Sequence, residues 1–271
     1  MKKLMIAGAA ALCATVGFSD VTSANIVGYA KKNCGANIFV QAGAQFESVK
    51  DGLLKADEIF SGLPGVDYDY GGDFLATAPQ IQVVATDGSG KPTAYFYLND
   101  GYVEADGSTK PGWCDSFGNI VDLTIVAGSG FWLKNTDNVA HDFQGAGQVT
   151  AQNSSDITAP AGIFTINANV YPIAINLNNA DQVSFPDIVG VDYDYGGDFL
   201  GTAPQIQVVA TDGSGKPTAY FYLNDGYVEA DGSTKPGWCD SFGNIVDVNI
   251  AAQSGFWVWA KTGAFKFTYK K

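Results

Sequence analysis

The chain contains one stretch of sequence twice. Residues 65–122 read GVDYDYGGDFLATAPQIQVVATDGSGKPTAYFYLNDGYVEADGSTKPGWCDSFGNIVD, and residues 190–247 repeat all 58 positions with one change, Ala76 against Gly201. We call each stretch a copy. Only 4 of the 30 positions at 35–64 agree with their counterparts, so uniform drift does not account for both regions. We interpret the identity as a recent segmental duplication and not as evidence of a preserved site.

The repeat extends beyond the copies. SGFW occurs at 129–132 and, at the same offset of 125 residues, at 254–257. Self-similarity at a fixed period indicates tandem units of one fold, and we place them at 20–143 and 144–271. The run QNSS at 152–155 lies at their junction. This polar run is compatible with units that pack together and with units that sit apart.

Short strands and tight turns dominate each unit. Polar and apolar residues alternate over 80–83, and a glycine-rich turn at 87–91 leads into a strand at 93–98, which predicts a hairpin. Further strands are expected at 24–29, 36–42, 102–105, 120–126 and 131–134. The pattern predicts an all-β fold of two tandem β-sandwich-like units.

At most one short helix is expected in each unit. Val49, Leu53 and Phe60 have roughly helical spacing, and Ser48 followed by Asp51 resembles a capping box. The counterpart at 172–185 has no such pattern.

The first 19 residues have the three-part pattern of a secretory signal peptide. Lys2 and Lys3 precede an apolar run at 4–18 that is too short to span a bilayer stably, and small residues lead to a polar start at Asp20. We therefore expect a secreted, periplasmic or cell-surface protein. No later apolar run reaches about 18 residues, so no membrane span is predicted.

The acidic net charge of the chain argues against a nucleic-acid partner. The chain has 28 acidic residues against 15 basic ones and a net charge of −13, and none of the basic residues is arginine. Nucleic-acid binding needs a basic surface, and arginine is the usual phosphate clamp. We therefore predict no nucleic-acid partner, whereas an envelope component, a polysaccharide or a second copy of the chain remains a candidate.

Three cysteines follow the signal peptide, and their pairing is left open. Cys114 and Cys239 are repeat equivalents, whereas Cys34 corresponds to Ala159. Export permits disulfides, so a Cys34–Cys114 bridge, a Cys114–Cys239 bridge and three free thiols are all considered. No Cys-x-x-Cys motif accompanies them to suggest metal binding.

The ends of the first unit carry a resemblance. Residues 23–29 read SANIVGY and residues 128–132 read GSGFW, with a tyrosine-rich hairpin between them. This arrangement resembles secreted tandem-repeat envelope proteins of bacteria in the Planctomycetes and Verrucomicrobia group. The second unit departs from it, with TAQN at 150–153 where the first has NIVG at 25–28. The resemblance implies an exported, non-enzymatic surface module and names no site residue.

Alternating aspartates before a glycine pair suggest a calcium loop. A hard cation takes several oxygen ligands from a curled chain, but Ala78 and Ala203 stand where the bidentate glutamate would be expected. An exposed strand entering a turn would give the same pattern. Calcium is thus the one cofactor considered, at Asp67, Asp69, Asp73, Asp192, Asp194 and Asp198.

Tyrosines on the hairpin suggest a carbohydrate platform. Sugar C–H faces stack on aromatic rings, and alternation places Tyr95 and Tyr97 opposite the aliphatic face of their strand. Ordinary strand packing is the competing explanation. Trp132, Trp257 and Trp259 are expected to be core residues instead. The glycan-binding candidates are Tyr95, Tyr97, Tyr102, Trp113, Tyr220, Tyr222, Tyr227 and Trp238.

An enzyme is the least favoured class. His141 is the only histidine, so no Ser/His/Asp or Cys/His site is built twice. A carboxylate pair could cleave glycosides, and Glu104 and its repeat equivalent Glu229 each lie near aspartates in the sequence. The sequence thus favours an exported, non-enzymatic structural or adhesive module of the cell envelope. The alternative is a carbohydrate-binding protein that uses a tyrosine and tryptophan face.

Overall fold

The computed structural model describes residues 26–48, 54–56, 64–84, 91–102, 107–194, 196–209, 216–226 and 235–271. Strands make up 45% and helices 4% of the structure, which confirms the predicted all-β class. Several predictions fall outside the described residues, namely the signal peptide and the candidates Glu104, Tyr227 and Glu229. Val49, Leu53 and Phe60 lie outside them as well, but Leu54 and Lys55 between these positions form a strand, so the predicted helix over this segment is wrong.

A five-stranded antiparallel sheet forms the centre of the first unit. The predicted hairpin is present, with Gln82 opposite Ala94 in its register. One short helix, α2 (Phe74–Thr77), precedes it. The strand order is β2 (Phe39–Gly43), β8 (Gly130–Lys134), β4 (Gln80–Val84), β5 (Pro92–Leu98) and β6 (Gly112–Cys114).

The second unit repeats this sheet and its helix. The helix is α3 (Phe199–Thr202). The strand order is β11 (Phe164–Ala168), β18 (Gly255–Trp259), β14 (Gln205–Val209), β15 (Pro217–Leu223) and β16 (Gly237–Cys239).

Smaller sheets pack beside the large ones. β1 (Ile26–Cys34) pairs with β9 (His141–Val149), so strand pairing ends the first unit after Val149, a few residues later than expected. In the second unit β19 (Phe265–Lys270) pairs with β10 (Ser154–Ala159) and with β13 (Val183–Ser184). Phe267 of β19 packs edge-on against Phe256 of the large sheet at 5.5 Å, as in a sandwich.

Two short ladders show that the offset between the units changes within 35–64. Leu54 of β3 (Leu54–Lys55) pairs with Ile125 of β7 (Thr124–Ile125). Ile175 of β12 (Ile175–Asn176) pairs with Ile250 of β17 (Asn249–Ile250). Since Ile125 and Ile250 are equivalent, Leu54 corresponds to Ile175 at an offset of 121 residues. An offset of 125 therefore holds at Gly43 and Ala168 but misaligns Leu54 by four residues.

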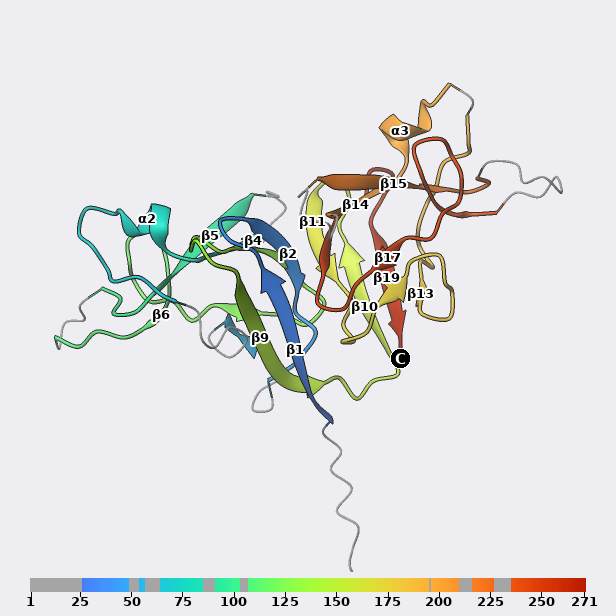
Figure 1. Ribbon diagram of the computed structural model, residues 1–271. Helices are drawn as coiled ribbons and strands as arrows, with labels where there is room; N and C mark the ends of the chain where they lie inside the picture. Colours follow the sequence, from blue (N-terminus) through green and yellow to red (C-terminus); the bar gives the residue numbers. More distant parts are fainter. Residues whose placement is uncertain are drawn as a thin grey trace, which may run out of the picture.

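The two units pack as one body. The Gly43 N–H donates to the Gln253 carbonyl at 3.0 Å, and the Ala168 N–H donates to the Gly128 carbonyl at 2.8 Å. Gly43 is equivalent to Ala168, and Gly128 to Gln253, so the contact is reciprocal, as in a two-fold dimer. Figure 1 shows β2 and β11 side by side between the units, with α2 and α3 at opposite ends.

Glycine at the start of each SGFW strand permits this approach. A Cβ on Gly255 would lie 2.5 Å from the Ala42 carbonyl oxygen, and one on Gly130 would lie 2.9 Å from that of Asn167. Both distances are too short for a side chain. Buried residues of both units, including Phe131 and Phe256, form one continuous core, so the alternative of separate units is excluded.

Candidate functional site

The predicted carbohydrate platform is wrong at its central residues. Trp113 and Trp238 are 0% exposed. Tyr95, Tyr97, Tyr220 and Tyr222 are only partly exposed and pack against the main core. The register explains this, because Tyr97 lies opposite Trp113 and both side chains point to the core side of the sheet.

The other face of the same strand is covered as well. Phe96 packs edge-on against Phe74 of α2, with ring centroids 5.7 Å apart. Leu98 and Cys114 complete this second, smaller cluster. The alternation of side chains along β5 therefore does not separate a solvent-exposed face from a buried face, because both faces are covered. Tyr102 is 44% exposed but lies edge-on to Tyr68, apart from Tyr95 and Tyr97.

The calcium candidates do not converge. The Asn99 side-chain amide donates to Asp67 at 3.1 Å, and Asn224 bonds Asp192 in the same way. The backbone N–H of Phe199 donates to Asp194 at 3.2 Å. Asp73 and Asp198 precede the two short helices without forming a side-chain cap, and the Asp69 backbone carbonyl accepts a hydrogen bond from the Gly72 N–H at 3.3 Å. Within the described ranges, no three carboxylate, thiol or imidazole groups lie close enough to hold a metal.

Each copy instead exposes an aromatic residue at a tight turn. The Asp115 carboxylate accepts hydrogen bonds from the backbone N–H groups of Phe117 and Asn119, at 2.8 and 3.0 Å. Asp240 does the same for Phe242 and Asn244. These hydrogen bonds satisfy the backbone N–H groups of the turn, and the phenylalanine ring of each turn points outward.

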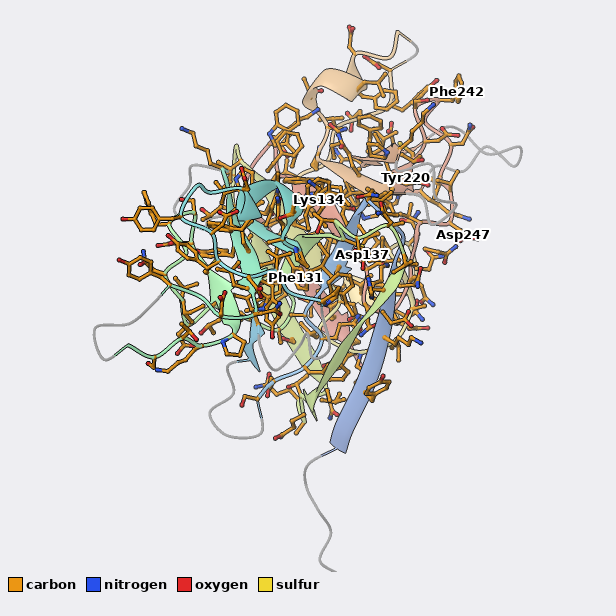
Figure 2. All side chains as sticks on the ribbon, turned by 60° about the vertical axis from the view of Figure 1, so that its left-hand side comes forward. Phe131, Lys134, Asp137, Tyr220, Phe242 and Asp247 are labelled. Atoms are coloured by element: carbon orange, nitrogen blue, oxygen red, sulfur yellow. The ribbon has the colours of Figure 1, made fainter. Side chains whose placement is uncertain are left out.

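The exposed rings define a tip on each unit. Phe117 and Phe242 are each 75% exposed, and Tyr70 in the neighbouring loop of the first unit is 90% exposed. We call Phe117 and Phe242, with their turns, the copy tips. Figure 2 shows Phe242 at the outer margin of the second unit. In that unit, Tyr193 and Phe199 line a surface depression together with Phe242.

All three cysteines are free and buried. Burial raises the pKa of the Cys34 thiol to about 11 and those of Cys114 and Cys239 to about 12. Cys114 and Cys239 belong to separate clusters beneath α2 and α3, which rules out the bridge between them in this structure. A raised pKa keeps a thiol protonated and poorly nucleophilic at neutral pH.

The lone histidine has a structural contact. His141 Nε2 lies 2.7 Å from Asp137 Oδ2 on the same turn. This contact is the main reason why the pKa of Asp137 is lowered. The pair lies at the start of β9, where the chain returns to pair with β1, and the strand register places His141 directly opposite Cys34.

One exposed aromatic surface was not predicted. Trp132, Trp257 and Trp259 were expected in the core, but all three are half-buried on the sheet face that points away from it. The rings of Trp132 and Trp257 contact each other across the unit boundary, with centroids 6.2 Å apart. The period-2 pattern in Phe131–Trp132–Leu133 was the available signal, since the two neighbours of Trp132 are fully buried.

Comparison with known proteins finds no matching family model, no matching curated protein and no matching solved structure. The candidate surfaces are therefore judged on their own geometry. In the part of the chain that the structure describes, no helix is long and apolar enough to cross a membrane.

Proposed function

We propose that the chain is an exported, non-enzymatic structural or adhesive module of the cell envelope that presents the surface of its copies twice. The observation that carries the proposal is the pair of copy tips. Each holds a phenylalanine in water on an aspartate-bonded turn of the same geometry. A large apolar ring in contact with water is unfavourable in free energy, and a binding partner that covers the ring removes this unfavourable term.

The packing of the two units supports a bivalent role. The reciprocal contact at Gly43 and Ala168 fixes the units relative to each other, so the tips are held apart on one body. Two equal sites at fixed separation gain avidity for a repetitive partner, because the second contact forms within the complex. An envelope offers such repetition. The signal-peptide pattern and the resemblance at 23–29 and 128–132 support this location.

Binding to washed envelopes of the producing cells tests the proposal. We expect Phe117→Ser and Phe242→Ser each to weaken binding and the double variant to abolish it. Val139→Ser is the matched control, because Val139 is 56% exposed but lies outside both copies. Recovery of the native protein in the cytoplasmic fraction, or envelope binding by the double variant equal to that of the control, would contradict the proposal.

A further inference from the structure

Five aromatic rings contact one another in succession across the two large sheets, on the faces that point away from the core. Phe39 lies 6.2 Å from Trp132, and Trp132 lies 6.2 Å from Trp257, measured between ring centroids. The line continues from Trp257 to Phe164 at 5.9 Å and from Phe164 to Trp259 at 4.6 Å. We call these five residues the aromatic row. All of them keep part of their surface in solvent.

A buried glutamine holds the ring at the centre of the row. Gln41 accepts a hydrogen bond from the Trp257 indole N–H at 2.8 Å when its own amide nitrogen donates to the Gly255 carbonyl at 3.3 Å. Gln41 belongs to the first unit and Trp257 to the second. The polar group of the indole is thereby satisfied, and the rest of the ring is left for apolar contact.

Side-chain amides border the tryptophans on the same face. The register places Gln82 directly opposite Trp132, and its repeat equivalent Gln207 opposite Trp257. Directly opposed residues on paired strands share a face, so each amide lies beside a ring. Amides donate and accept hydrogen bonds without charge. Each of the two central tryptophans of the row thus has a neutral hydrogen-bonding group beside it, and the Gln82 amide also donates to Gln80 Oε1 at 3.4 Å.

The charge of this face differs from that of the rest of the chain. The strands that carry the row and its amides, β2, β4, β8, β11, β14 and β18, contain no aspartate or glutamate, although the chain has 28 acidic residues. The charged groups at the two ends are amines. Lys134 lies 5.5 Å from the Phe39 ring centroid, and Lys261 lies 4.3 Å from that of Trp259. This arrangement disfavours a cationic ligand.

We propose that the aromatic row binds a neutral polysaccharide chain. Hexose rings present apolar C–H faces that stack on aromatic rings, and their hydroxyl groups match the amides of Gln82 and Gln207. Because the row crosses from one unit into the other, the site is complete only when both units are packed. It lies on the sheet faces rather than at Phe117 and Phe242, so it is independent of the function proposed for the copy tips.

Native electrophoresis of the full-length mature protein in gels that contain a polysaccharide tests this proposal. The neutral probes are hydroxyethylcellulose, xylan and galactomannan, alginate is the acidic probe, and a sugar-free gel gives the reference mobility. We expect at least one neutral probe to retard the protein. Trp259→Ala should weaken that retardation about five- to tenfold, whereas Val139→Ser, at an exposed residue outside both the row and the copy tips, should leave it unchanged.

A second variant guards against loss of fold. Gln82→Ala removes one amide without removing a ring, and it should also weaken retardation while the melting temperature stays close to that of the wild type. The proposal is overturned if no neutral probe retards the protein, or if only alginate does. Equal retardation of Trp259→Ala and the wild type, or equal slowing in the sugar-free gel through self-association, would overturn it as well.

Discussion

Trp132 and Trp257 occupy the same position in their repeats, and their rings touch, with centroids 6.2 Å apart and ring planes at 51°. A residue that contacts its own repeat equivalent lies close to the two-fold axis that relates the units. The reciprocal hydrogen bonds of Gly43 and Ala168 flank the same axis. The chain therefore contains, within one polypeptide, the kind of interface that identical subunits form in a symmetric dimer.

The single difference between the copies offers a stability test. Gly201 lies in α3, where an added Cβ meets nothing within 4 Å, and Ala76 holds the equivalent position in α2. Alanine restricts the unfolded chain more than glycine does. We expect Gly201→Ala to raise the free energy of unfolding by about 0.5–1 kcal/mol.

The reverse change, Ala76→Gly, is the matched control and should lower the free energy of unfolding by a similar amount. Urea denaturation of both variants measures these effects. If Gly201→Ala were destabilising, the open environment at this position would be wrong.

Two buried tyrosines should respond differently to loss of the hydroxyl. Among the described residues, the Tyr269 hydroxyl has no hydrogen-bond partner, whereas the Tyr171 hydroxyl donates to the Gln152 carbonyl at 2.8 Å. Removing an unsatisfied buried group is neutral or favourable, and removing a satisfied one has a cost. We expect Tyr269→Phe to change stability by zero to about +1 kcal/mol and Tyr171→Phe to lower it by about 1 kcal/mol. Chemical denaturation distinguishes them, and the opposite order would contradict the described contacts.

The buried thiols predict a loss of stability at alkaline pH. Burial raises the pKa of Cys114 to about 12, whereas the pKa of a cysteine in an unfolded chain is about 8.5. The folded state thus holds the proton more tightly. Below the pKa of the unfolded state, this difference does not reduce the free energy of unfolding. As the pH rises from the unfolded pKa toward the folded pKa, the free energy of unfolding falls by up to about 1.4 kcal/mol per pH unit.

The Cys114→Ala variant tests this linkage. Between pH 8 and 10 its free energy of unfolding should fall less steeply than that of the wild type, after allowance for a constant offset from the lost packing. Identical slopes would show that the thiol ionises as readily in the folded protein. Since all three cysteines are free, a reducing agent should leave the melting temperature unchanged.

Local sequence patterns predicted the strands, whereas tertiary packing determined which side chains of those strands are exposed. Alternation at 80–83 and the following turn were sufficient for the hairpin, since its register depends on neighbouring residues. The same reasoning failed for Tyr97, because α2 is too short to leave a sequence signal and yet covers the opposite face through Phe74. The alternation in Phe131–Trp132–Leu133 was sufficient to place Trp132 on the outer face, whereas its contact with Trp257 depends on how the second unit packs.

A double-mutant cycle on Trp132 and Trp257 is the most direct test of the central claim that the two units form one body around this contact. Unfolding free energies of Trp132→Ala, Trp257→Ala and the double variant give the coupling between the rings. We predict a coupling of about 0.5–1.5 kcal/mol, as for aromatic pairs in contact. Strictly additive losses would mean that the rings do not meet and that the units are not packed in this way.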